Sequence, residues 1–203
     1  MPYHALLSLW TQPRATLHEV MRHRPGNSSV GLVVVAGYLW FAQQFLIQDI
    51  GSLLVTFALL ALPIGAIVLL YFQAWAIRHV CRWFDGKGDG LAIRASLAWG
   101  GVPAMVGMVL WLLGYLLYGD DMLWMEQIPA QAPENSAALL LGLLGAAFNI
   151  HGLVVTCKML SEANGFNAWI AFAAMLVTVM LVVAAAMVVA MPLVMLFGPS
   201  MMG

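Results

Sequence analysis

Few residues of this chain have side chains suited to chemistry, and two of them interrupt a long apolar run. Asn149 and His151 lie inside the apolar segment from Ala137 to Leu160. An ionisable side chain at membrane depth is costly and by default marks a functional site, here a polar path or a proton-sensitive site. The alternative is hydrogen bonding between helices, worth about 0.6–2 kcal/mol per bond. Residues two apart on a helix point in different directions, and hydrogen bonding is the favoured interpretation.

A second polar stretch, FDGKGDG at residues 84–90, is similar to two ligand-binding loops and matches neither. Lys87 and Ser96 stand where an EF-hand loop needs an Asp or Asn and a Glu, so calcium is not expected. The glycine spacing also differs from that of a phosphate-binding P-loop. We predict a flexible turn with no catalytic group, no metal and no cofactor.

A third polar stretch, KMLSEANGFNAW at residues 158–169, separates two apolar runs. Gly165 suits the left-handed conformation that ends a helix, and Asn167 suits the N-cap of the next helix. Lys158 and Glu162 are four apart and are expected to pair weakly. The stretch therefore predicts a tight turn between two helices.

Composition determines the class of protein in which these polar stretches are set. Hydrophobic residues make up 63% of the chain, charged residues 8%, and the mean hydropathy is +0.92, whereas soluble domains are about 25% charged. A soluble fold is excluded. The chain is predicted to be an all-α, polytopic membrane bundle of five transmembrane helices, with apolar runs at Val30–Ile47, Leu53–Phe84, Leu91–Tyr118, Ala137–Leu160 and Ala168–Phe197.

The distribution of Lys and Arg predicts the orientation of these spans. All eight lie before the first span, around the second connection or near the end of the fourth span, while the other connections carry only acids. Cytoplasmic loops of membrane proteins retain Lys and Arg. The N-terminus is therefore predicted to be cytoplasmic and the C-terminus outside.

The N-terminal segment, residues 1–29, is predicted to be an interfacial helix preceding a membrane domain at residues 30–203. Thr11 is a suitable N-cap and Pro13 suits the first turn. An apolar stripe, expected to lie at the headgroup boundary, follows at helical spacing. Three basic residues are expected to contact anionic lipid, namely Arg14, Arg22 and Arg24.

Taken together, the order of these motifs resembles the Yip family, the Ypt-interacting proteins, over about residues 6 to 195. The matching features are Trp10 and Pro13, the turn of Gly86, Lys87 and Gly88, Pro103 in the third span, and residues 161–169 with Glu162, Gly165, Phe166 and Trp169. The short N-terminal segment is similar to the compact bacterial branch. That resemblance implies a multi-pass protein of the bacterial inner membrane.

The resemblance implies an accessory or scaffolding role, with the lipid bilayer and a membrane-protein partner or a second copy as contacts. Rab-type GTPase binding is not expected, because the long N-terminal region of eukaryotic relatives is missing here. Nucleic acid is not an expected partner. The sequence contains no hydrolase, zinc or nucleotide motif, so a non-enzyme is predicted. The alternative is a small transporter or channel that uses Asn149 and His151.

Overall fold

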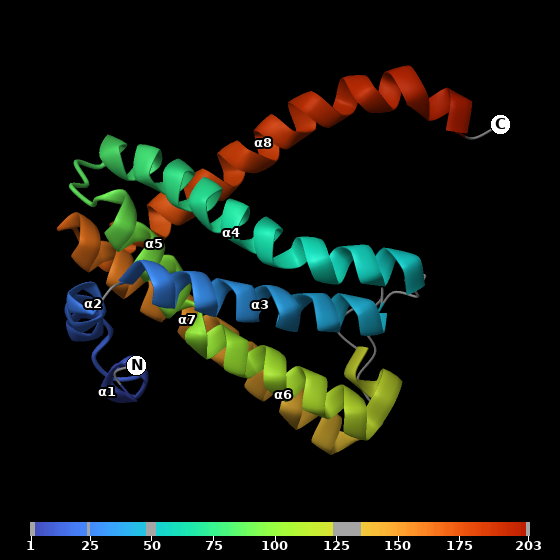
Figure 1. Ribbon diagram of the computed structural model, residues 1–203, viewed down its shortest axis with the longest axis horizontal. Helices are drawn as coiled ribbons and strands as arrows, with labels where there is room; N and C mark the ends of the chain where they lie inside the picture. Colours follow the sequence, from blue (N-terminus) through green and yellow to red (C-terminus); the bar gives the residue numbers. More distant parts are fainter. Residues whose placement is uncertain (1–2, 24, 48–51, 124–134, 202–203) are drawn as a thin grey trace.

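The computed structural model describes residues 3–23, 25–47, 52–123 and 135–201, and its regular structure is entirely helical there. Figure 1 shows an elongated bundle whose helices run mostly along one direction. The elements in chain order are α1 (Tyr3–Ser8), α2 (Pro13–Arg22), α3 (Pro25–Ile47), α4 (Ser52–Trp83), α5 (Gly90–Gly100), α6 (Val102–Tyr118), η1 (Gly119–Leu123), α7 (Ser136–Asn164) and α8 (Ala168–Met201).

Five stretches of the described chain are long and apolar enough to cross a membrane, which confirms the predicted all-α, five-span architecture. They are Gly26–Leu46, Leu59–Trp83, Gly90–Leu123, Ser136–Asn164 and Ala168–Val188. The helix of the first span, α3, begins earlier than predicted, at Pro25 and not at Val30. Proline suits this position because its fixed φ and missing N–H are both tolerated in the first turn of a helix.

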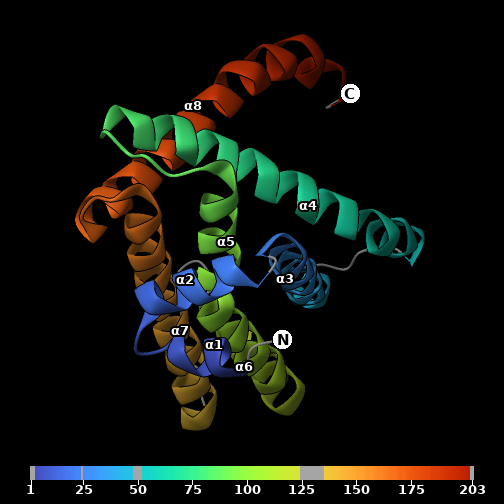
Figure 2. The ribbon, with the colours of Figure 1, turned by 60° about the vertical axis from the view of Figure 1, so that its left-hand side comes forward.

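The third span, predicted as an apolar run from Leu91 to Tyr118, consists of two helices. α5 ends at Gly100 and α6 begins at Val102, with Pro103 in the first turn of α6. Proline has no N–H and its ring clashes with the carbonyl four residues earlier, so the helix is interrupted just before it. Gly101 still donates to the Leu97 carbonyl at 3.2 Å, which joins the two helices without a loop (Figure 2).

α6 and α7 share the most extensive contact between described helices, and glycine makes their close approach possible. A Cβ at Gly107 would lie 2.7 Å from the carbonyl oxygen of Gly145, and a Cβ at Gly152 would lie 3.0 Å from the amide nitrogen of Ala104. Small residues let membrane helices approach until their backbones touch. These two glycines therefore hold α6 and α7 together along much of their length.

The buried core of the described residues lies toward one end of the bundle. One cluster joins α4, α5, α7 and the start of α8, with Cys81, Ile93, Leu160 and Ala171 fully buried. Farther along, the backbone of α8 leaves the other helices (Figures 1 and 2). The described side chains from Leu181 to Val188 are all exposed. Tertiary packing is thus dense at one end and open at the other.

The N-terminal helix exists at the predicted place, but its apolar side faces the rest of the bundle and not the outside. Its apolar stripe is covered by α5 and α7, because Leu17 and Val20 are 3% and 2% exposed and pack with Trp99 and Val155. Its N-cap is Gln12, not Thr11 as predicted. A helix this short is not stable alone. Packing of its apolar stripe against the bundle supplies the additional stability.

The α6–α7 contact generates the first testable prediction. Gly107→Ala places a methyl group against the Gly145 backbone, and overpacking of this kind costs about 1–3 kcal/mol. The matched control is Gly31→Ala, since a Cβ at Gly31 meets nothing within 4 Å and the change should leave stability equal or higher. Unfolding in detergent, followed by circular dichroism, measures both. Equal stability of the two variants would contradict the described packing.

Candidate functional site

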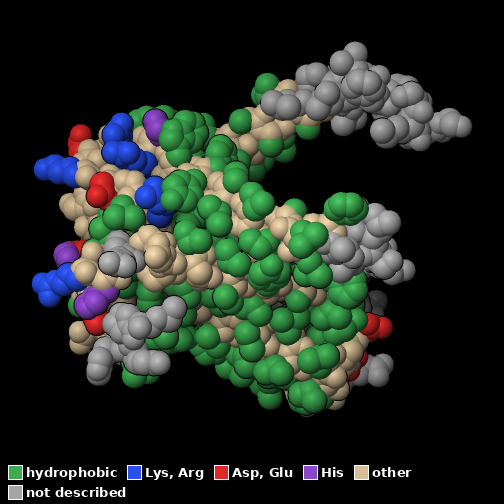
Figure 3. Space-filling view, in the orientation of Figure 1, with side chains coloured by type: hydrophobic (Ala, Val, Ile, Leu, Met, Phe, Trp, Pro, Cys, Tyr) green, Lys and Arg blue, Asp and Glu red, His purple; other side chains and the backbone are tan. Residues whose placement is uncertain are grey.

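The described Lys and Arg residues gather at one end of the molecule, here called the charged end (Figure 3). They lie on α2, on the last turns of α4, on the connection that follows it, on the first turns of α5 and near the end of α7. The acids Asp120 and Asp121 of η1 lie at the opposite end. Arg24 falls outside the described residues. This segregation matches the pattern from which a cytoplasmic N-terminus was predicted.

The turn after α4 and the turn after α7 meet at Asn164. Gly88 donates its N–H to Asn164 Oδ1 at 3.1 Å, and Lys87 donates its N–H to the Asn164 carbonyl at 3.1 Å. Asn164 Nδ2 donates to the Leu160 carbonyl at 2.9 Å, and the residue is 2% exposed. The 84–90 stretch is therefore pinned in place, which corrects the prediction of a flexible turn.

The glycines on either side of Lys87 are required by this close approach. A Cβ at Gly86 would lie 2.7 Å from Asn164 Oδ1, and one at Gly88 would lie 2.6 Å from the same atom. Distances this short are not found for real Cβ atoms, so a side chain at either position would displace Asn164 or the turn. The Gly-Lys-Gly motif thus has a structural reason, while the Lys87 side chain stays exposed.

The predicted tight turn between α7 and α8 is confirmed. Gly165 has φ +76° and donates its N–H to the Ser161 carbonyl at 2.9 Å. Asn167 Oδ1 accepts the N–H of Trp169 at 3.1 Å and so caps α8. Phe166 packs against the buried cluster at this end.

The predicted pairing of Glu162 with Lys158 is wrong. Glu162 pairs instead with the N-terminal helix. His18 Nε2 lies 2.9 Å from Glu162 Oε1, and Arg14 Nε lies 3.9 Å from Glu162 Oε2. Exposed pairs of this kind contribute about 0.2–1 kcal/mol. Their main effect is therefore to orient α2, whose position rests mostly on the buried apolar stripe.

Trp10 accounts for the environment of His151. Its ring stacks on the imidazole at 5.6 Å with an interplanar angle of 5°, and it meets Phe148 edge-on at 5.7 Å. His151 Nε2 is buried without a hydrogen-bond partner. Asn149, by contrast, is exposed and donates to the Gly145 carbonyl of its own helix at 2.9 Å. The structure therefore gives the two predicted polar residues separate environments.

The remaining predicted residues are dispersed. Pro13 and Pro103 are buried in the first turns of α2 and α6, whereas Trp169 is exposed. Sequence reasoning missed Asn164 as the connecting residue. Its place before Gly165 signals the end of a helix, but no local pattern reveals a partner on a distant turn.

A comparison with known families matches most of the chain. The family model of the Yip1 domain matches residues 7–191. The chain belongs to the Yip1 domain family. Searches of curated proteins and of solved structures gave no match. The Yip1 domain thus extends from α1 into α8 and includes Asn164, both turns and all five apolar spans.

The contacts of Asn164 generate a second prediction. Asn164→Ala leaves the buried N–H of Gly88 without its partner and removes the side-chain bond to the Leu160 carbonyl, at a cost of about 1–3 kcal/mol. The turn should loosen, and trypsin should cleave after Lys87 faster than in the parent. The control is Asn135→Ala, which removes an exposed cap of α7 and should not change cleavage at Lys87. Unchanged cleavage in Asn164→Ala would contradict the role given to its side chain.

The contacts of Glu162 generate a third prediction. Glu162→Gln weakens the pairing with Arg14 and His18, so α2 should detach more often and trypsin should cut faster after Arg14 and Arg22. Global stability should fall by less than about 1 kcal/mol. Glu19→Gln, on the same helix, serves as the control because no ion pair to Glu19 is seen among the described residues. Equal cleavage in both variants would count against Glu162 as the orienting group.

Proposed function

We propose that this Yip1 domain is a non-enzymatic accessory protein of the bacterial inner membrane that organises partner membrane proteins. Its family and its five apolar helices make it a multi-pass membrane protein. The accessory role, the bacterial inner membrane and the absence of catalysis are the parts that we propose beyond this. It includes no Rab-type GTPase and no nucleic acid among the partners.

The observation that carries the proposal is the ordered cationic surface at the charged end. α2 is fixed by its buried stripe and by Glu162, and the turn that carries Lys87 is fixed by Asn164. Exposed cations are thereby held on a defined surface, namely Arg14, Arg22, Arg82 and Lys87. Complementary charge selects partners and speeds their encounter, so an acidic segment of a membrane protein suits this surface.

The positive-inside rule supports a cytoplasmic position for this surface. In that orientation we expect Arg14 and Arg22 to lie near anionic headgroups. Each contributes about 1 kcal/mol of attraction to the membrane. Lipid contact then steadies α2 beside the bilayer, while its apolar stripe stays on the bundle.

The alternative of a transporter gains no specific support from the described residues. Neither Asn149 nor His151 lines the cavity found between α3 and α4. Asn149 bonds to its own helix and His151 stacks on Trp10. Asn149 is thus accounted for by its own helix, whereas the buried Nε2 of His151 has no hydrogen-bond partner among the described atoms.

Co-purification from native membranes tests the proposal. Tagged protein at native level, extracted in nanodiscs, should retain one membrane protein in stoichiometric amount, identified by mass spectrometry. The double variant Arg82→Gln with Lys87→Gln should lose most of it. The control, Asp120→Asn with Asp121→Asn at the opposite end, should retain it. No stoichiometric protein, or equal retention by both variants, would overturn the proposal; a reporter fused to the C-terminus checks orientation throughout.

A further inference from the structure

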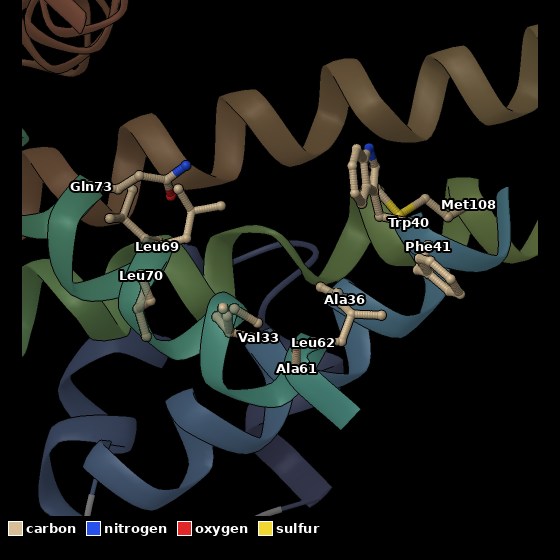
Figure 4. A pocket seen from close by; sticks show the side chains of 14 residues that line it. Val33, Ala36, Trp40, Phe41, Ala61, Leu62, Leu69, Leu70, Gln73 and Met108 are labelled. Atoms are coloured by element: carbon tan, nitrogen blue, oxygen red, sulfur yellow. The ribbon is translucent and has the colours of Figure 1, made fainter. Parts of the chain in front are cut away.

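An apolar cavity of about 700 Å³ lies between α3 and α4. Figure 4 shows Gln73 and Leu69 at one end of it and Trp40 and Phe41 at the other. Trp40 and Leu69 are each 53% exposed, so the cavity opens at the surface of the bundle. Both helices belong to apolar spans, and the opening therefore faces the surroundings of those spans in a membrane.

The size of the cavity suits one slender ligand and not a helix of another protein. Its lining on α4 extends from Ala61 to Gln73, about 18 Å at about 1.5 Å per residue. A helix of that length and about 10 Å across occupies about 1,400 Å³, twice the volume of the cavity. Pockets that hold one small molecule have about 300–1,000 Å³. One hydrocarbon chain has a matching length, because a leaflet is about 15 Å thick, half of the about 30 Å core.

Gln73 has a polar side chain that the described residues leave unpartnered. It carries the only amide among the described lining residues, which are otherwise apolar or glycine. Its side chain makes no hydrogen bond to another described residue. A polar side chain at membrane depth is costly and by default marks a functional site. A ligand that bonds to this amide inside the cavity would supply the missing partner.

The position of Gln73 selects an uncharged ligand. Gln73 precedes Arg78 and Arg82 on α4 by five and nine residues, about 8 Å and about 14 Å along the helix. Arginine side chains near the ends of membrane helices extend toward the headgroups, which puts Gln73 deeper than the phosphates. No charged side chain is among the described lining residues, and an unpaired charge buried there would be very costly.

A hydroxyl fits the Gln73 amide best among uncharged groups. The amide has two N–H donors and one carbonyl acceptor, and a hydroxyl can both accept and donate. An ester or ketone oxygen can only accept, so it would leave the amide oxygen without a partner. The chemistry of the cavity thus favours a lipid alcohol over an ester of the same chain.

We propose that this Yip1 domain binds one uncharged, single-chain lipid with a hydroxyl head. The hydroxyl bonds to the Gln73 amide, and the chain lies along α4 toward Trp40 and Phe41. The lipid enters from the membrane through the exposed side of the cavity. The site is separate from the cationic surface at the charged end, and it does not depend on the partner protein proposed above.

Selective retention tests the hydroxyl. The full chain is placed in phosphatidylcholine nanodiscs with equal small amounts of monoolein and methyl oleate, which share one chain, and is then extracted in mild detergent. Mass spectrometry of the retained lipid should show about two- to tenfold more monoolein in the parent, the ratio expected for one neutral hydrogen bond. Gln73→Leu should lose this preference. Gln43→Leu, the same change outside the lining, should keep it.

A second pair of variants tests the chain. Gly65→Leu fills the cavity, because Gly65 lines it and a Cβ there meets nothing within 4 Å, and it should retain neither probe. Gly31→Leu, equally open and outside the lining, should behave as the parent. Equal retention of the two probes by the parent, or an unchanged preference in Gln73→Leu, would overturn the proposal. Full retention by Gly65→Leu, or retention of phosphatidylcholine alone by the parent, would also overturn it.

Discussion

The buried side chain of Asn164 is the interaction on which the charged end of this protein depends. It accepts from the turn after α4 and donates within α7, so two connections far apart in sequence are held as one unit. The end of α7 fixed in this way also presents Glu162 to Arg14 and His18 of α2. The two turns thus take their positions from the buried hydrogen bonds of Asn164, and α2, which rests mostly on its apolar stripe, is oriented beside them by Glu162.

This concentration of specific contacts at one end follows from the membrane as solvent. Lipid tails are as apolar as leucine, so burial between membrane helices gives little driving force, and close backbone approach must replace it. α6 and α7 achieve this through Gly107 and Gly152, while many apolar side chains of α3 and α4, and those of α8 from Leu181 to Val188, are exposed. At the charged end, the N-terminal helix docks through an apolar stripe that is buried against α5 and α7.

The sequence was sufficient to predict what short-range patterns control. The five spans, the cap at Gly165 and the cap at Asn167 were confirmed because hydropathy and capping act within a few residues. Long-range partners could not be predicted. An apolar stripe such as that of α2 fits lipid and protein equally well, and nothing near Trp10 in the chain indicates that it stacks on His151. The break between α5 and α6 at Gly101 was also not predicted, since proline is tolerated in many membrane helices.

The central claim is that α2 is docked on the bundle beside Glu162 when the protein is in a membrane. The direct measurement is thiol crosslinking in native membranes, using His18→Cys with Glu162→Cys and a short bifunctional reagent, after Cys81→Ala and Cys157→Ala remove the buried thiols. His18 with Asp120, also changed to Cys, is the control pair, because η1, which carries Asp120, lies at the opposite end. The account predicts a crosslink in the first pair alone. Two reactive thiols that never crosslink in the first pair would contradict it.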